Sequence, residues 1–262
     1  MTTPTPTAGP APAAPATSTA SPLTRALGVL SLVGLAAAAW LGLVASPRDA
    51  VQEDAVRLMY VHVPAVTWMY IAVFVSAFGS FMWLRKRTDG WDVLAAAAAE
   101  IALVLTGLGL FTGSVWGRPT WGVYWVWDAR LTSTAILFVL LLGYQALRRY
   151  PAEAHARSRM SAVLGLLLVP NAMIVHFSVD WWRSLHQDAT VSKLDVSIEG
   201  LMLFTLGLSF VVMGVVFTWL LVHRFRLGWL ERSADRHHLD AALADRRADA
   251  DPSAGVAVGG AR

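Results

Sequence analysis

Long uncharged apolar stretches constrain what this chain can fold into more than any other feature. Six runs of roughly 17–24 residues each match the length that an α-helix needs to cross a hydrocarbon layer of about 30 Å. They lie approximately at 27–44, 64–84, 93–115, 131–147, 160–177 and 198–221. Charged residues make up only 15% of the 262, which is low for a water-soluble domain. The runs therefore predict an all-α integral membrane protein with six transmembrane helices.

Composition along the chain predicts three regions. Residues 1–22 are mostly Pro, Ala, Thr and Ser without an apolar period, which is typical of a disordered tail. Residues 23–232 hold the six runs and form the predicted membrane domain, whereas residues 233–262 turn polar and predict a second disordered tail. The first run is interpreted as an uncleaved helix, because only Arg25 precedes it and no convincing cleavage site follows.

The distribution of Lys and Arg predicts how the helices are oriented. Fifteen of the 21 basic residues fall at one end, counting the C-terminal tail from Arg224 onward. The other end has six: Arg48, Arg57, Arg118, Arg130, Arg183 and Lys193. Basic residues concentrate in cytoplasmic loops, so both termini are expected in the cytoplasm, an N-in and C-in topology. The segments 45–63, 116–130 and 178–197 are then expected to face outward.

Tryptophans gather on the predicted outward face. Four fall within twelve consecutive positions: Trp116, Trp121, Trp125 and Trp127. Trp181 and Trp182 bring half of the chain's twelve tryptophans to this side. Because Trp121 and Trp125 are four apart, we expect them to share one face of a short interfacial helix. An aromatic belt at headgroup level would account for single tryptophans, but a one-sided group suits a flat, largely apolar ligand such as a porphyrin better.

Three of the seven histidines lie in or near the outward segments. The sequence places His62 two residues before Pro64, which predicts a position just outside the start of the second helix. His186 lies beyond the end of the fifth run. Two imidazoles from different segments can reach a porphyrin iron from opposite faces. His176 is an alternative second ligand, although its place at the end of an apolar run favours packing inside the bundle. For His62 and His186, hydrogen bonds to lipid headgroups or to the backbone are the simpler interpretation.

Charged residues beside the tryptophans are candidates for polar contacts with such a ligand. Arginine forks match carboxylates, so Arg118 and Arg130, together with Arg57 and Arg183, could receive porphyrin propionates or simply lipid headgroups. Asp128 is interpreted as a structural partner of Arg130 or of backbone donors. Glu100, within the third run, is expected to face a partner helix or to lie nearer the cytoplasmic surface, and we assign it no function.

Other classes of function are disfavoured by what the sequence lacks. The chain has no cysteine, which excludes disulfides, thiolate metal sites and covalent attachment of heme. Basic residues flank the apolar runs instead of forming a stripe, so a nucleic-acid partner is not expected. Nucleophile–base pairs, phosphate loops and hydrolase metal spacings are missing from the sequence, so we do not expect an enzyme.

Three stretches resemble one family of heme-handling proteins. The stretch from Trp116 to Thr132 resembles the tryptophan-rich "WWD" signature. The stretches Tyr60 to Pro64 and His176 to Gln187 resemble the two histidine segments of the CcmC family, heme exporter protein C of the system I cytochrome c maturation pathway. The motifs occur in the same order, and the resemblance covers roughly residues 25–230 with the same six-helix layout. After Asp128 the chain continues as in CcmC, without the proline that follows in the large cytochrome c synthetases.

The resemblance implies a cofactor, ligands and partners. Members of the family hold heme b non-covalently at the outer face of the bacterial inner membrane and pass it to the heme chaperone CcmE. By motif, the two axial ligands correspond to His62 and His186, and not to His176. The signature residues correspond to Trp116, Trp121, Trp125, Trp127 and Asp128. The family works with an ABC-type complex of CcmA and CcmB and with the small subunit CcmD.

Two other classes of membrane protein are open alternatives. A b-type electron-transfer protein would also use two histidines, but it usually places them at membrane depth and has a second pair across the bilayer. A heme or solute transporter could also be built from six helices, yet the sequence shows neither an internal repeat nor paired broken helices.

Overall fold

The computed structural model describes residues 18–150, 153–186, 198 and 200–250. Six long helices dominate this part of the chain, and all six are long and apolar enough to cross a membrane. They are α1 (Pro22–Trp40), α2 (Met59–Lys86), α3 (Asp89–Trp121), α4 (Ala129–Arg149), α5 (Ala154–Trp181) and α6 (Gly200–Ala250). A π-helical turn, Leu41–Ala45, extends α1, and a 3-10 helix, Asp54–Leu58, leads directly into α2. The prediction of six transmembrane helices is confirmed.

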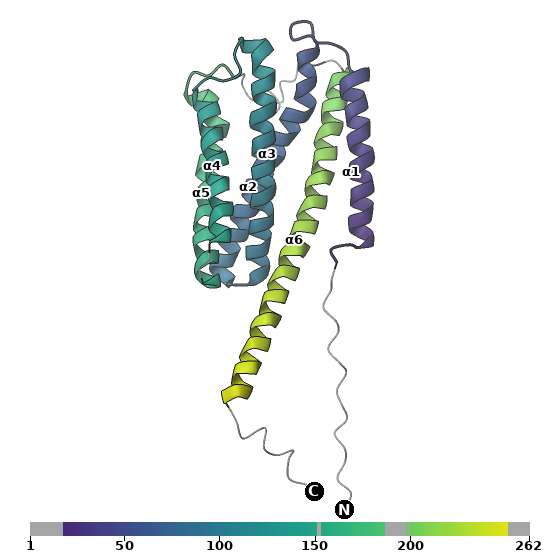
Figure 1. Ribbon diagram of the computed structural model, residues 1–262. Coiled ribbons are helices and arrows are strands. Elements are labelled where there is room, and N and C mark those ends of the chain that lie inside the picture. Colours follow the sequence, from purple (N-terminus) through teal and green to yellow (C-terminus); the bar gives the residue numbers. More distant parts are fainter. Residues whose placement is uncertain (1–17, 151–152, 187–197, 199, 251–262) are drawn as a thin grey trace, which may run out of the picture.

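The helices run up and down in a single bundle (Figure 1). Short connections make α2 and α3 antiparallel neighbours, and α4 and α5 form a second pair beside them. Helix α6 slants across α2 and α3, and α1 packs against the outer side of α6. The core contains many small side chains at 0–1% exposure, such as Ala65, Ala72 and Ala102, which let helices approach closely where no water drives them together.

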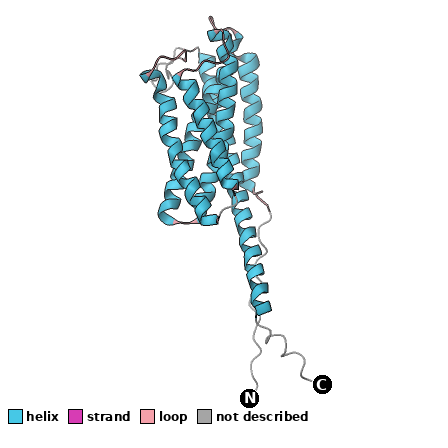
Figure 2. Cartoon of the chain, turned by 60° about the vertical axis from the view of Figure 1, so that its left-hand side comes forward, coloured by secondary structure: helices cyan, strands magenta, loops and turns pink. Residues whose placement is uncertain are grey.

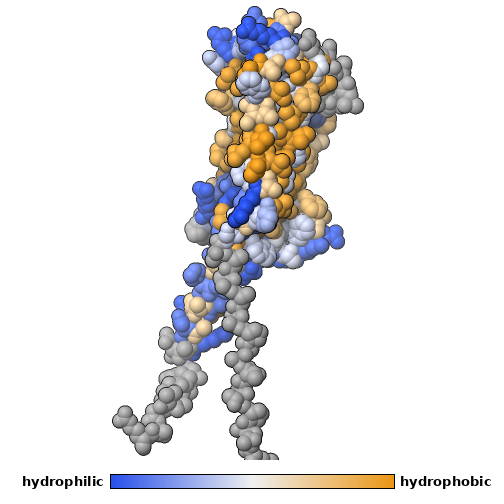
Figure 3. Space-filling model, turned by 90° about the vertical axis from the view of Figure 1, so that its right-hand side faces the viewer, coloured by the Kyte–Doolittle hydropathy of each residue, from blue (hydrophilic) through white to orange (hydrophobic). Residues whose placement is uncertain are grey.

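A broad apolar belt lies between two polar ends on the face shown in Figure 3, and all six helices expose large apolar side chains. Large side chains in it point away from the protein: Leu32, Phe111 and Val211 are each more than 60% exposed. Such a surface would be unfavourable in water, but in a bilayer it contacts lipid tails. The protein is therefore a multi-pass membrane protein.

Charged side chains hold the helices together at the end where α2 and α3 meet. Asp92 on α3 is buried and accepts hydrogen bonds from Arg148 of α4 (2.7 Å) and from Arg232 of α6. Glu100, within α3, accepts a hydrogen bond from Arg224 of α6 at 2.8 Å. The expectation that Glu100 faces a partner helix is thus confirmed.

The C-terminal region is helical further than the composition predicts. Helix α6 continues to Ala250 and projects beyond the bundle (Figure 2), so residues 233–250 are not the disordered tail expected from residue 233 onward. This stretch has neither Gly nor Pro, and Ala, Leu and Arg, which all favour helix, together make up more than half of it. Arg236 also binds Asp89 at 2.9 Å, which ties the start of the projection to the bundle. Residues 1–17 and 251–262 of the predicted tails lie outside the described residues.

Candidate functional site

The predicted outward segments meet at one end of the bundle, where α1, α3 and α5 end and α2, α4 and α6 begin (Figure 1). Side-chain contacts connect them: Trp116 reaches Gln52, and Arg130 reaches Ser178. The last segment is described only as far as His186, so Lys193 lies outside the described residues. The sequence correctly predicted that these three segments belong to one end of the molecule.

His62 lies inside α2, and the prediction that it stands just outside the helix is wrong. Helix α2 begins at Met59, five residues before Pro64. The 3-10 helix Asp54–Leu58 runs straight into α2, so the chain is already helical when it reaches the proline. Because Pro64 is near the start of α2, its missing N–H removes only one hydrogen bond, to the carbonyl of Tyr60. His62 is consequently held by a helix and not by a loop.

The His62 ring packs against α3. Its Nδ1 lies 3.0 Å from Oγ1 of Thr112, which also donates a hydrogen bond to the carbonyl of Leu108 at 2.7 Å. The ring of Trp116 meets the imidazole edge-on, with 5.8 Å between ring centroids. Gly113 lies under the ring, since a Cβ at this position would approach Cε1 of His62 to 2.9 Å. One face of α3 thus sets the position of the first histidine.

Trp116 is held in turn by the connection between α1 and α2. Its Nε1 donates a hydrogen bond to Oε1 of Gln52 at 2.7 Å. Asp49 shapes this connection by accepting from the backbone N–H groups of Gln52 (2.7 Å) and Val51 (2.9 Å). These two hydrogen bonds hold the pKa of the Asp49 carboxyl below its usual value, the one from Gln52 most of all.

His186 approaches the same end from the segment after α5. Its Nδ1 lies 3.2 Å from Nη1 of Arg130, and Trp121 flanks it with 6.1 Å between ring centroids. Arg130 also donates to the carbonyl of His176 at 2.7 Å. Trp116, beside His62, and Trp121, beside His186, both lie in the last part of α3. The structure thus brings the two predicted histidines to the same end of the bundle, one from α2 and the other from the segment after α5.

Asp128 joins α4 to the segment that carries His186. It is the N-cap residue of α4, and Oδ1 accepts from the backbone N–H of Leu131 at 2.8 Å. Its other oxygen accepts from the hydroxyl of Ser184 and from the backbone N–H of Leu185 (3.3 Å). The role predicted for Asp128 as a partner of backbone donors is confirmed.

The tryptophans do not form a single helical shelf. Helix α3 ends at Trp121, where Gly122 adopts the left-handed conformation with φ of 80°. Trp125 and Trp127 lie in the connection to α4 and contact each other at 5.5 Å between ring centroids. The prediction that Trp121 and Trp125 share a helix face is therefore wrong. Nε1 of Trp125 is buried without a hydrogen-bond partner among the described residues, whereas Trp127 is 81% exposed.

The remaining candidates make local contacts. Arg118 donates to the carbonyl of Gly122 at 2.7 Å and lies over the ring of Tyr124. Arg57 donates to the carbonyl of Gly42 at 2.7 Å and binds Asp54 at 2.9 Å. These bonds stabilise the connections around the site.

His176 packs inside the bundle. Its ring meets those of Tyr70 and Phe177 edge-on, with 5.7 Å and 4.9 Å between centroids. The interpretation of His176 as a packed residue is confirmed, although its carbonyl serves the site by accepting from Arg130.

Sequence reasoning did not find Thr112, Gln52 or Ser184, each of which contacts a predicted site residue. Thr112 precedes Trp116 by four residues on α3, and this spacing alone could have pointed to it. Gln52 and Ser184 lie 64 and 56 residues from their partners, so only the tertiary structure reveals them.

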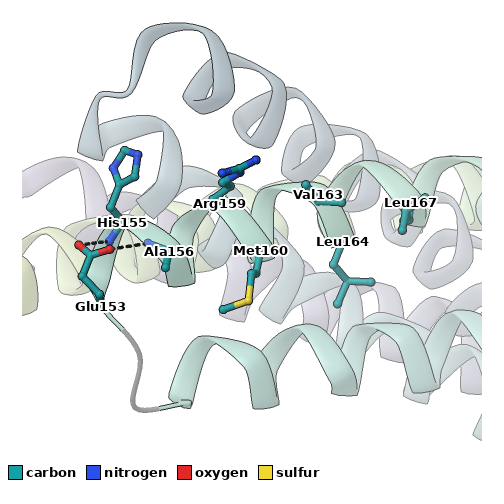
Figure 4. A pocket seen from close by; sticks show the side chains of 8 residues that line it. All are labelled: Glu153, His155, Ala156, Arg159, Met160, Val163, Leu164 and Leu167. Carbon is teal, nitrogen blue, oxygen red and sulfur yellow. Dashed lines mark hydrogen bonds between the residues drawn. The ribbon is translucent and has the colours of Figure 1, made fainter.

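Two surface hollows lie at the opposite end of the bundle and contain none of the predicted site residues. One follows a single face of α5 from Glu153 to Leu167 (Figure 4). Met160, Val163 and Leu167 in it are each 40–55% exposed within the apolar belt, so this hollow is a furrow that lipid tails can fill. The other lies between the start of α3 and α6.

The fold and the site define a class: a six-helix membrane protein with two histidines, flanked by tryptophans and an arginine, at one end of its bundle. The family model of CcmC, described as heme exporter protein C, matches residues 9–240, and the chain belongs to this family.

Curated relatives agree with this assignment. Heme exporter protein C of Haemophilus influenzae is 36% identical over 211 residues, which is 79% of this chain and 85% of that protein. The protein of the same name from Bradyrhizobium diazoefficiens is 41% identical over 185 residues, 68% of this chain and 66% of its own. A ccmC-like mitochondrial protein of Marchantia polymorpha, named for cytochrome c biosynthesis, is 36% identical over 176 residues, 67% of this chain and 74% of its own.

Proposed function

We propose that this protein holds heme for cytochrome c maturation, with His62 and His186 as the two axial ligands of the iron. The observation that carries the proposal is the placement of these two histidines at one tryptophan-rich end of the bundle, His62 of α2 beside Trp116 and His186 of the segment after α5 beside Trp121. The relatives named as heme exporters and for cytochrome c biosynthesis support the choice of ligand and pathway.

The residues at the site suit heme as cargo. Bound heme presents an iron that accepts two nitrogen ligands, a flat apolar ring and two carboxylates. Trp116 lies beside His62 and Trp121 lies beside His186. Both indoles offer apolar surface for the porphyrin ring. Arg130, which now binds His186, can form a stronger, charge-assisted hydrogen bond with a carboxylate. The unpartnered Nε1 of Trp125 is a further donor.

Three further residues of the predicted site contact other groups than the two imidazoles. Arg118 and Trp127 contact neither histidine directly, and Asp128 acts by positioning the segment of His186. We propose Arg118 as a secondary contact for a propionate and Trp127, which is largely exposed, as a surface for a docking partner. Asp128 supports heme binding through its hydrogen bonds to Ser184 and Leu185.

The setting of the site follows from the family and from the charge distribution. We infer that heme is b-type and non-covalent, since the chain has no cysteine. The basic end of the bundle is assigned to the cytoplasm, so the heme site faces the periplasm from the inner membrane. Heme is then passed to the chaperone CcmE, and an ABC-type complex of CcmA and CcmB with CcmD is the partner in the membrane. Membership of the heme exporter family supports these assignments.

An optical titration tests the ligand assignment. The full chain in detergent is titrated with hemin as wild type, His62→Ala and His186→Ala, with His155→Ala at the opposite end as the matched control. Wild type and the control are expected to give a six-coordinate low-spin spectrum, whereas each site variant loses that signature and binds hemin at least about tenfold more weakly, because one nitrogen ligand is gone. Unchanged spectra and affinity in both site variants would overturn the proposal.

A further inference from the structure

The two histidines are not held alike: Nδ1 of His62 contacts the hydroxyl of Thr112, whereas Nδ1 of His186 contacts the guanidinium of Arg130. We infer that Thr112 is a positioning residue, which keeps His62 in the tautomer that can bind iron before any heme arrives. The inference rests on the proposed function, because it concerns the same site, but it assigns a role to a residue on α3 that touches neither heme nor iron in that proposal.

The hydroxyl hydrogen of Thr112 is already used. Oγ1 lies 2.7 Å from the carbonyl oxygen of Leu108 and 3.4 Å from that of Gly109, and a carbonyl can only accept. A hydroxyl has one hydrogen to donate and lone pairs that accept. The contact of 3.0 Å between Oγ1 and Nδ1 of His62 is therefore donated by the histidine. Nδ1 of His62 carries the proton.

This assignment leaves the other ring nitrogen ready for a metal. A neutral imidazole has one protonated and one unprotonated nitrogen, and the unprotonated one binds the metal. With the proton on Nδ1, Nε2 of His62 is the nitrogen that carries the lone pair a metal can accept. Ligating histidines usually donate their second ring N–H to a fixed acceptor, and the hydroxyl of Thr112 is such an acceptor.

His186 is held in the opposite way. Arginine has no acceptor, so in the contact of 3.2 Å the guanidinium of Arg130 donates to Nδ1 of His186. The neutral His186 ring then carries its proton on Nε2, where iron would bind. His62 is thus the prepared ligand, whereas His186 must change its partner and its tautomer when heme arrives.

The surroundings of Thr112 restrict the ring further. Thr112 is 5% exposed, so water does not compete readily for its hydroxyl. Gly113, its neighbour, leaves room for Cε1 of His62, which a Cβ would approach to 2.9 Å. Trp116, one turn further along α3, packs edge-on against the same imidazole. The tautomer and the orientation of His62 are therefore set together by one helix face.

The test compares Thr112→Val with Thr112→Ser in the full chain. Valine keeps the volume and removes the acceptor, whereas serine keeps the acceptor. Thr106→Val is the matched control, because Thr106 is buried on the same helix and its hydroxyl bonds only the carbonyl of Ala102 among the described residues. We expect Thr112→Val to raise the Kd for hemin about 10–100-fold, with Thr112→Ser and Thr106→Val close to wild type.

A second readout uses the heme-free protein and does not depend on hemin affinity. Nitrogen NMR of ¹⁵N-histidine protein, at a pH where imidazoles are neutral, reports which ring nitrogen carries the proton. His62, identified by its loss in His62→Ala, is expected as the Nδ1–H tautomer in wild type, Thr112→Ser and Thr106→Val, and to shift toward Nε2–H in Thr112→Val. If Thr112→Val does not fold, Gly113→Ala, which keeps the hydroxyl but displaces the ring, is expected to weaken hemin binding in the same titration.

The two proposals fail in different ways. If wild type and His62→Ala bind hemin alike, the ligand assignment itself is wrong. If His62→Ala loses binding but Thr112→Val keeps both the wild-type Kd and the Nδ1–H signal, only the role of Thr112 is overturned. Equal losses in Thr112→Val and Thr106→Val would also overturn it, because general damage to α3 would then explain the result.

Discussion

At the scale of single residues, short polar side chains determine how the site histidines are placed. Thr112 and Gln52 act on the side of His62, through the imidazole itself and through Trp116. Asp128 acts on the side of His186, because one of its oxygens caps α4 and the other binds the segment 184–185. Each side chain connects two elements, so its loss is expected to change the geometry of the site as well as the stability.

Replacing Asp128 separates these two effects. Asp128→Ala is expected to lower stability by about 1 kcal/mol through loss of the cap and to weaken hemin binding, because the segment of His186 loses its anchor. The control is Glu153→Ala, which removes the cap of α5 at the opposite end, where the side chain accepts from the backbone of His155 and Ala156 at 2.8 Å. Thermal melting and hemin titration report both quantities. Wild-type affinity in Asp128→Ala would show that this anchor does not support the site.

At the scale of helices, α3 is the element on which the others are positioned. At the outer end it carries Thr112 and Trp116, which contact His62. At the other end its buried Asp92 binds Arg148 of α4 and Arg232 of α6. Asp92 also lies in the first turn of α3, where a negative charge is favourable to the helix dipole. The charges at one end therefore keep α4, which carries Arg130, beside α3.

Removing the central carboxylate tests this role. Asp92→Ala is expected to destabilise the protein by about 2 kcal/mol, because Arg148 loses its carboxylate and Arg232 keeps only Asp89. The two arginines retain 17% and 23% exposure, which moderates the cost. Asp240→Ala, on the exposed projection of α6, is the control and is expected to melt as wild type. The measurement is thermal unfolding in detergent. Equal melting temperatures for both variants would refute the role of Asp92.

At the scale of the whole molecule, the apolar belt separates two chemically different ends (Figure 3). One end gathers tryptophans and the two site histidines, whereas the other holds the paired charges and the projecting part of α6 (Figure 2). A belt of this kind leaves the protein two ways to lie in a bilayer, and the basic residues favour the tryptophan-rich end outside. The proposed handover of heme at the outer face depends on this orientation.

The absence of cysteine makes the orientation directly measurable. Val51→Cys places a thiol in the connection after α1, where the side chain is 90% exposed, and Asp240→Cys places one on the projection of α6. In intact cells, a membrane-impermeant maleimide is expected to label Val51→Cys, and to label Asp240→Cys only after the inner membrane is opened. The reverse pattern would place the site in the cytoplasm and contradict the proposed handover.

Local properties of the sequence were sufficient to predict the number of membrane-spanning helices and the class of protein. Hydrophobicity averaged over about 20 residues depends on neighbours in sequence alone, so the six helices could be predicted. The proposal of His62 and His186 as ligands also rests on residue type and place along the chain. Helix ends were predicted less well, since the 3-10 helix before α2 and the left-handed Gly122 after α3 changed the settings of His62 and Trp125.

The relations that prepare the site could come only from the tertiary structure. His62 and Thr112 are 50 residues apart, and Arg130 and His186 are 56 apart. A hydrogen bond depends on distances of a few tenths of an ångström, and these are set by how whole helices pack, for which a single sequence contains no direct measure. The sequence thus predicted which residues could bind heme and in which kind of protein, whereas only the packing of α3 against α2 and α4 shows which side chains contact each histidine.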